Sequence, residues 1–167
     1  MNVNAKEVVV LVGSGQIGQA IARRVGAGRH IVLADLKQEH AGQAAKVLED
    51  AGFETSTLAV DISSRQSIIE LIEHAKQFGA IKYLIDAAGV SPSQAPVSQI
   101  LKVDLYGTAV LLEEFGKVIA AGGSGIIISS QSGHRLGALT PEENEQLATT
   151  PTEELLDLPF LREITDT

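Results

Sequence analysis

The sequence predicts an α/β fold: a doubly wound parallel sheet of about five strands in the order 3-2-1-4-5, followed by a C-terminal acidic helical segment. Short runs rich in β-branched residues alternate with longer amphipathic stretches, a pattern typical of strands that alternate with helices. The connections are short, which implies right-handed crossovers and a sheet covered by helices on both faces. The length of 167 residues allows one such domain and is too short for two of ordinary size.

Composition excludes several other classes of protein. The hydrophobic share of 44% rules out a disordered chain, and the absence of Cys rules out disulfide frameworks and thiolate metal sites. The four His share no ligand-like spacing, so no metal site is predicted. The net charge of −8 argues against nucleic-acid binding, which requires clustered Lys and Arg. No apolar run approaches a membrane helix, and the opening MNVNAKE does not resemble a signal peptide, so we expect a cytoplasmic protein.

Charge and glycine are distributed unevenly along the chain. Residues 1–136 carry 12 basic and 13 acidic side chains (net −1), whereas residues 137–167 carry one basic and eight acidic (net −7), which together give −8. All 16 glycines lie at or before Gly137. This division predicts a balanced, glycine-rich body over 1–133 and an acidic helical flap over 134–167 that belongs to the same domain.

The strands and helices of the body follow from local patterns. Glu7–Val12 (EVVVLV) is too short and too β-branched for a buried helix and ends at glycines, so it predicts the first strand. A helix follows over 17–27, where Ile17, Ile21 and Val25 share one face. The same patterns predict further strands over 30–34, 53–60, 81–85 and 125–129, and further helices over 38–51, 64–78 and 98–121.

The acidic flap contains two similar helix starts, Thr140-Pro141-Glu142-Glu143 and Thr150-Pro151-Thr152-Glu153. Each offers Thr as the N-cap, Pro at the first helical position and Glu three residues after the Thr, which is the pattern of a capping box. Apolar side chains in the second unit predict that it packs against the body rather than extending into solvent; these are Leu155, Leu156, Leu158, Phe160 and Leu161.

A glycine-rich turn joins the first strand to the first helix: Gly13-Ser14-Gly15-Gln16-Ile17-Gly18, which fits G-x-G-x-x-G. Gly13 would permit the tight turn, Gly15 the close approach of a pyrophosphate, and Gly18 the close packing of helix on strand. The helix N-terminus would then face the phosphates with unpaired N–H groups. The alternative is a plain strand-to-helix turn, but the position between a strand and a helix favours a Rossmann-type dinucleotide site.

Acidic residues end the second and third predicted strands. Asp35 lies 17 residues after Gly18, where a carboxylate can accept from the hydroxyls of an adenosine ribose and repel a 2′-phosphate, which favours NAD over NADP. Lys37 and the pair Arg23-Arg24 are nearby cations that could serve a 2′-phosphate; the alternative for Asp35 is a cap on the helix from 38. Asp61-Ile62 is expected near the adenine ring, with an Asx-type cap before the helix at 64 as the alternative.

The fourth strand ends in small residues, Asp86-Ala87-Ala88-Gly89. Small side chains at this position would let the backbone approach a cofactor, although they would equally suit a tight turn. We therefore include Ala87, Ala88 and Gly89 among the predicted cofactor contacts.

Together these features resemble the short-chain dehydrogenase/reductase family. The resemblance rests on four segments in order over residues 7–133: the glycine turn, Asp35, the motif at 86–89, and Ile128-Ser129-Ser130-Gln131-Ser132-Gly133. Two segments depart from the usual pattern. The family's strand-four motif is usually Asn-Asn-Ala-Gly, and its Thr-Gly-x-x-x-Gly-x-Gly loop is one residue longer than the turn in this chain.

The resemblance implies roles for two further residues. Ser130 matches the family's Ser that orients the substrate oxygen; Ser129 and Ser132 are neighbouring candidates, and a loop-capping hydroxyl is the alternative. Asp104 aligns with a family Asn in the long helix, but a carboxylate cannot donate as an amide does.

The family's acid/base pair, a Tyr with a Lys four residues later, has no match in this sequence. The two tyrosines, Tyr83 and Tyr106, are followed four residues later by Ala87 and Val110, and we expect both to be packing residues. The chain thus looks like the N-terminal two-thirds of a family member that ends before its catalytic Tyr, and we expect the chain as written to turn over poorly.

The sequence therefore predicts an NAD-preferring oxidoreductase, with NADP as second choice, that moves a hydride between nicotinamide and a small carbonyl or alcohol substrate. The first alternative is a non-catalytic dinucleotide-binding module. The second, less favoured, is an S-adenosylmethionine-dependent methyltransferase. From the resemblance we expect a homo-oligomer, dimer or tetramer, formed through the helix at 98–121. Five apolar residues of that helix are candidates for core or interface: Leu101, Leu105, Leu112, Phe115 and Ile119.

Overall fold

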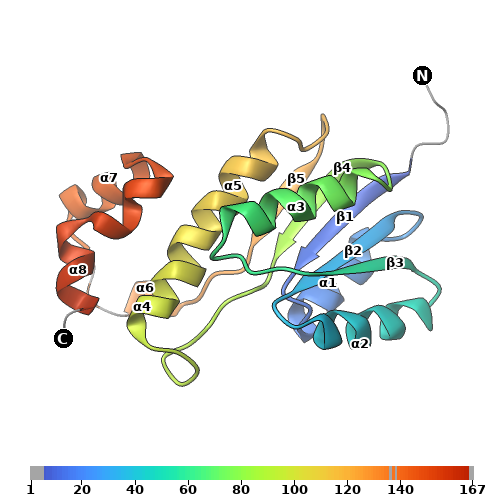
Figure 1. Ribbon diagram of the computed structural model, residues 1–167, viewed down its shortest axis with the longest axis horizontal. Coiled ribbons are helices and arrows are strands. Elements are labelled where there is room, and N and C mark those ends of the chain that lie inside the picture. The colour runs from blue at the N-terminus through green and yellow to red at the C-terminus, as the bar shows by residue number, and fades with distance from the viewer. Residues whose placement is uncertain (1–5, 136, 138, 166–167) are drawn as a thin grey trace.

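A computed structural model describes residues 6–135, 137 and 139–165, so part of the predicted flap (136, 138 and 166–167) and residues 1–5 of the opening MNVNAKE lie outside the described residues. Five parallel strands form one sheet in the order β3-β2-β1-β4-β5, which confirms the predicted order (Figure 1). The strands are β1 (Glu7–Val12), β2 (His30–Asp35), β3 (Glu54–Ala59), β4 (Ala80–Asp86) and β5 (Ser124–Ile127).

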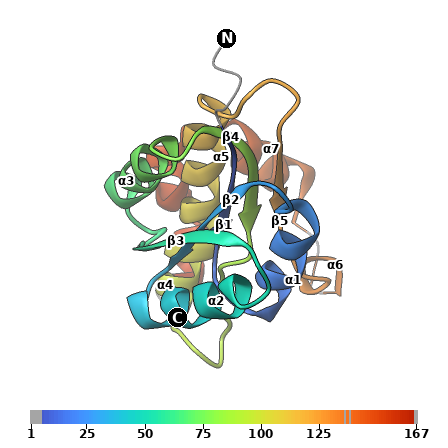
Figure 2. The same cartoon turned by 90° about the vertical axis from the view of Figure 1, so that its right-hand side faces the viewer.

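Helices cover both faces of the sheet (Figure 2). The helices α1 (Gln16–Val25) and α2 (Gln38–Glu49) lie on one face, and α3 (Arg65–Lys76) and α5 (Thr108–Gly116) on the other. Alternate side chains of β1 serve the two cores, because Val9 and Leu11 pack with α1 and α2 whereas the other valines pack with α3 and α5. All of β1 from Val8 to Val12 is at most 1% exposed, as expected for the central strand of a doubly wound sheet.

The predicted helix over 98–121 is wrong in two respects. It consists of a short α4 (Val97–Ile100), a π-helical segment η1 (Leu101–Gly107) and α5, and it ends at Gly116. Two tertiary contacts accompany the wide turns of η1. Asp104 Oδ1 accepts the N–H of Val90 at 3.0 Å, and a side chain at Gly107 would lie 2.7 Å from the carbonyl oxygen of Ile62.

The C-terminal part contains α6 (Ser132–Arg135), α7 (Pro141–Thr149), a 3-10 helix η2 (Thr152–Asp157) and α8 (Pro159–Thr165). The first capping box is confirmed: Thr140 Oγ1 accepts the N–H of Glu143, whose carboxylate accepts the N–H of Thr140. The second is wrong. Pro151 is the N-cap of η2, and no side chain caps this end, because the carboxylate of Glu153 binds Arg65 and Tyr106 instead.

The C-terminal segment, which we define as residues 140–165, packs against η1 and the start of α5. Leu155, Leu158 and Leu161 are buried against Leu101 and Leu105, as predicted for this apolar face. The helices of this segment lie beyond α5, on the side away from β2 and β3 (Figure 1). The division of the domain between 133 and 134 stays a prediction.

Among the described residues, no helix is both long enough and apolar enough to cross a lipid bilayer. The described part of the chain also holds no cluster of three or more His, Cys, Asp or Glu side chains that could bind a metal ion.

Candidate functional site

Two cavities meet at the carboxyl ends of the strands. The first, of about 440 Å³, runs from the glycine turn and Asp35 past Asp61 and Ile62. The second, of about 550 Å³, lies beside β5 and is lined by Asp104 and Ser130. Both are lined by the loop after β4, with Ala87, Ala88, Gly89, Val90 and Gln94 common to the two cavities. The structure therefore brings predicted residues from the ends of all five strands to one continuous groove, at the edge where ligands bind in such sheets.

The glycine turn is fixed by close backbone packing. Gly13 adopts a φ of +83°, and a side chain there would lie 2.4 Å from the backbone nitrogen of Ala88. A side chain at Gly18 would lie 2.5 Å from Leu11 Cδ1. A side chain at Gly15 would meet nothing within 4 Å, and Gly15 is the N-cap of α1 with no side chain closing the helix end. Gly13 and Gly18 thus serve packing, whereas Gly15 leaves open space in front of helical N–H groups.

The other residues of the turn have different surroundings. Ser14 is buried and its Oγ donates to the carbonyl oxygen of Ala34 at 3.3 Å. Gln16 lines a third cavity, on the side of Asp35 that faces α2. Ile17 is 63% exposed and lines none of the three cavities.

Asp35 lies between the first and the third cavity, and the backbone holds its carboxylate. Oδ2 accepts the N–H of Ser14 at 3.0 Å, and Oδ1 accepts the N–H of Lys37 at 3.1 Å. Lys37, not Asp35, is the N-cap residue of α2, and its side chain makes no capping bond. The Asp35 carboxylate nevertheless accepts the Lys37 N–H at this end of the helix, so the capping alternative is present in part. The carboxylate is thereby oriented toward the groove.

Asp61 borders the first cavity and also forms the local turn that was its alternative interpretation. It lines the first cavity with Ile62, and its Oδ1 also accepts from the N–H of Ser63 at 2.9 Å and from the Ser63 hydroxyl at 2.7 Å. These bonds are those of an Asx turn before α3. Ser64, not Asp61, caps α3 by accepting the N–H of Ser67.

Two carboxylates line the second cavity. Asp86 is 1% exposed, and its Oδ1 accepts the N–H of Ala88 at 3.2 Å. Burial raises the pKa of Asp86 to about 6; the Ala88 N–H acts in the opposite direction and the neighbouring Asp104 raises it further. Burial also raises the pKa of Asp104, opposed by its bond to Val90. The end of β4 thus holds an acid that titrates far above an ordinary Asp, a property that its position among small residues had not suggested.

Ser130 lies in the loop after β5 and lines the second cavity together with Ser129. Its Oγ accepts the N–H of Ser132 at 3.1 Å and donates to the Ser132 hydroxyl at 3.1 Å. The loop-capping alternative is therefore present in the structure, and the hydroxyl still borders the cavity.

Neither tyrosine lines any of the three cavities. Tyr83 lies under the guanidinium of Arg29, whose Cζ is 5.0 Å from the ring centroid. Tyr106 is half-buried and its hydroxyl donates to Glu153 at 3.0 Å, so it joins the C-terminal segment to η1 in addition to packing.

Several lining residues were missed by sequence reasoning: Leu36, Val90, Gln94, Val103 and His40. Leu36 directly follows Asp35, and this adjacency was an available signal. The 90–103 stretch carries no motif, and Val90 at its start donates to Asp104, which lies 14 residues later.

Comparisons with known proteins agree with this geometry. A sequence model described as short chain dehydrogenase matches residues 6–141. The short-chain dehydrogenase/reductase bsc3 of Alternaria brassicicola is 38% identical over 160 residues, which cover 95% of this chain and 58% of that protein. The chain thus spans little more than half the length of this relative.

Solved structures show the same fold. A metagenomic short-chain oxidoreductase in complex with NADP superposes with a TM-score of 0.65 at 28% identity, over 76% of this chain and 63% of that one. An oxidoreductase from Haemophilus influenza with bound NAD superposes with a TM-score of 0.66 at 17% identity, over 98% of this chain and 68% of that one. With the family match over residues 6–141, these findings show that the chain belongs to the short-chain dehydrogenase/reductase family.

Proposed function

We propose that this chain binds NAD(H), and NADP(H) more weakly, and forms the cofactor half of an oxidoreductase acting on a small carbonyl or alcohol substrate. The observation that carries the proposal is the pair of cavities that meet at the loop after β4. One end of this groove has the carboxylate expected for an adenosine ribose, and the other has hydroxyl and carboxyl groups suited to a substrate oxygen.

The residues present fit a dinucleotide. The open space at Gly15, in front of the uncapped N-terminus of α1, suits the pyrophosphate, and Asp35 suits the ribose diol. Asp61 and Ile62 would border the adenine, and Ala88 and Gly89 the nicotinamide side. A bound nicotinamide supplies the hydride chemistry.

At the nicotinamide side, this chain's own groups would orient the substrate. The Ser130 hydroxyl can donate to a carbonyl oxygen, provided that it gives up its bond to Ser132. Asp104, which accepts from Val90, is the second candidate and would act as an acceptor rather than as a donor. Neither replaces the family's Tyr and Lys, so we expect these 167 residues to bind the cofactor far better than they turn over a substrate.

Calorimetric titration with NADH tests the proposal. We expect saturable binding, weakened at least tenfold in Asp35→Ala, because the ribose loses its acceptor. Asp50→Ala is the matched control, since Asp50 lies exposed at the end of α2, and it should leave the affinity unchanged. A folded sample that binds no NADH, or binds it equally with and without the Asp35 carboxylate, would contradict the proposal.

A non-catalytic dinucleotide-binding module is the second candidate, because the cavities that meet at the loop after β4 would suit a dinucleotide with or without turnover. Both candidates predict NADH binding, and turnover separates them. Oxidation of NADH with a panel of small ketones, at rates abolished by Ser130→Ala, would favour the oxidoreductase. The methyltransferase alternative is disfavoured by the family assignment.

Homo-oligomerisation through the 98–121 region is also a proposal. The C-terminal segment covers Leu101 and Leu105, and Phe115 is in the core, which leaves Leu112, at 53% exposed, as the open apolar position of α5. Light scattering on the wild type and on Leu112→Lys tests this: an oligomer that survives the substitution does not use this face.

A further inference from the structure

We propose that His40 is a cofactor-selecting residue: by pairing with the carboxylate of Asp35, it weakens the repulsion of a 2′-phosphate and lets the site accept NADP(H). This inference rests on the proposed dinucleotide function. Its starting point is that Nδ1 of His40 lies 3.4 Å from Oδ1 of Asp35, the carboxylate predicted to discriminate between the two cofactors.

Three groups contact the carboxylate of Asp35, one at Oδ2 and two at Oδ1. Oδ2 accepts one N–H, from Ser14, whereas Oδ1 faces both the N–H of Lys37 and the ring of His40. The Ser14 and Lys37 bonds leave about one lone pair free on each oxygen, so the carboxylate can still accept from a ribose hydroxyl. His40 lies beside Oδ1 as an ion-pairing group rather than as a hydrogen-bond donor, and an imidazolium there would offset part of the negative charge of the carboxylate. A 2′-phosphate would therefore meet less repulsion at this site than at an unpaired Asp.

The third cavity provides space for a 2′-substituent of the ribose beside Asp35. It lies on the α2 side of Asp35, has a volume of about 550 Å³, and is lined by Ser14, Gln16, Gln19, His40 and Gln43 among others. Asp35 and His40 are its ionisable lining residues, and the α1 side contributes neutral amides. On its own helix, His40 is flanked by Lys37 and Glu39.

His40 is also free to respond to a ligand. Its side chain is 55% exposed and belongs to neither hydrophobic core of the sheet, so the ring can turn from Asp35 toward a phosphate without disturbing the packing. A protonated imidazole then offers two N–H donors and a positive charge. Exposed pairs of this kind change affinities by small factors, so a change of about three- to tenfold in binding is expected.

The test compares dissociation constants for NADH and NADPH at pH 6. In His40→Ala we expect NADPH to bind about three- to tenfold more weakly and NADH to change less than about twofold. In His40→Arg, which keeps a permanent cation, NADPH should bind as well as in the wild type or better. Lys46→Ala removes an exposed cation from the last turn of the same helix and should leave the ratio of the two constants unchanged.

The possible failures are distinguishable. NADH binding with the same NADPH-to-NADH ratio in the wild type and in His40→Ala would overturn the role of His40 and leave the dinucleotide function standing. No binding of either nucleotide by the folded wild type would overturn both. Thermal unfolding of each variant verifies folding, which we expect to be unaffected because the imidazole lies outside both cores.

Discussion

The body and the C-terminal segment are held by different forces. In the body, β1 and the helices on both faces bury apolar side chains almost completely; Val8, Leu11 and Leu71 are all 0% exposed. The segment of residues 140–165 has three buried leucines, and beside them the carboxylate of Glu153 binds Arg65 and Tyr106. Apolar burial contributes far more than exposed ion pairs, so the body should unfold as one unit and the segment should detach at a lower cost.

Leu71→Ala removes a large side chain from the core between α3 and the sheet and should cause the largest loss. We expect about 2–5 kcal/mol lower free energy of unfolding, because a cavity is left in a close-packed core. Hydrogen exchange should show lost protection in the body and in the segment together. Val47→Ala, at a 45% exposed position of α2, is the control and should change stability by less than about 0.5 kcal/mol. Exchange that increases in α3 alone would contradict a single cooperative body.

Asp86→Asn tests how the buried carboxyl group of Asp86 affects the stability of the same body. The folded pKa of Asp86, about 6, lies above its ordinary value of 3.8, so the folded state holds the proton more tightly. Stability from this group is therefore full below about pH 4 and falls as the pH rises through 6. The loss corresponds to roughly 3 kcal/mol at most, from 1.36 kcal/mol for each pH unit of the shift.

Denaturant unfolding between pH 4 and pH 8 measures this effect. The wild type should lose stability over that range more steeply than Asp86→Asn, which keeps an acceptor for Ala88 and has no charge to bury. Asp50→Asn, at an exposed position, should follow the wild type. Parallel pH profiles for the wild type and Asp86→Asn would show that Asp86 ionises without cost.

Leu155→Ala addresses the segment alone. Leu155 is 3% exposed, and we expect a local loss of about 2 kcal/mol, near the lower end for buried leucines because the cluster is small and lies at the surface of the body. Protease cleavage within η2 and α7 should accelerate while the unfolding midpoint of the body changes little. Leu139→Ala, at a 39% exposed position, is the control. A matching fall in the stability of the body would mean that the two regions form one cooperative unit.

The same division explains what sequence could predict. The strand order and the glycine turn depend on local patterns, such as the continuous apolar run, rich in β-branched residues, over Val8–Val12 and the position of Gly13 before a helix. The features that were missed depend on partners distant in sequence. The π-helical turn at 101–107 accompanies contacts of Asp104 with Val90 and of Gly107 with Ile62. Glu153 does not form the expected capping box, because its carboxylate binds Arg65, which lies 88 residues earlier in the sequence.

The raised pKa of Asp86 and the pairing of His40 with Asp35 are missed for the same reason. From the sequence, a carboxylate at a strand end is predicted to bind a ribose or to form a turn. Its pKa and its ion pairs depend on the other elements that surround it in the fold. Periodicity can therefore locate a groove, but it does not predict the electrostatics of the side chains that line it.

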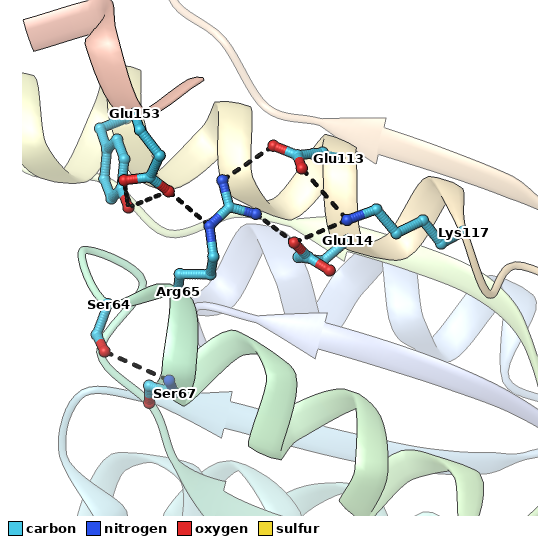
Figure 3. A network of polar contacts seen from close by, with 8 residues as sticks. Ser64, Arg65, Ser67, Glu113, Glu114, Lys117 and Glu153 are labelled. Carbon is cyan, nitrogen blue, oxygen red and sulfur yellow. Dashed lines mark hydrogen bonds and ion pairs between the residues drawn. The ribbon is translucent and has the colours of Figure 1, made fainter. Parts of the chain in front are cut away.

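Arg65 is where the two regions meet, and its removal should have the smallest effect. The guanidinium binds Glu113 and Glu114 of α5 and Glu153 of η2, and Lys117 adds a second cation at α5 (Figure 3). Glu113 and Glu153 are 40% and 63% exposed, whereas Arg65 is 24% and Glu114 13% exposed. Solvent screens the two exposed partners, so Arg65→Ala should cost about 1 kcal/mol, and high salt should reduce the difference.

The pH dependence of the resistance to proteolysis tests the ion pairs around Arg65 more specifically than the size of the stability loss does. Hydrogen bonds from Arg65, then from Thr152 and Lys117, lower the pKa of Glu113 from 4.5 to about 2. A lowered pKa gives a carboxylate a stabilising contribution that is present above its ordinary value and is lost as the pH falls from 4.5 toward 2. Arg65→Ala should therefore flatten the acid limb of proteolytic resistance in the segment, whereas Arg23→Ala, on the exposed side of α1, should retain it. If both variants keep the wild-type acid limb, the leucines alone hold the segment on the body.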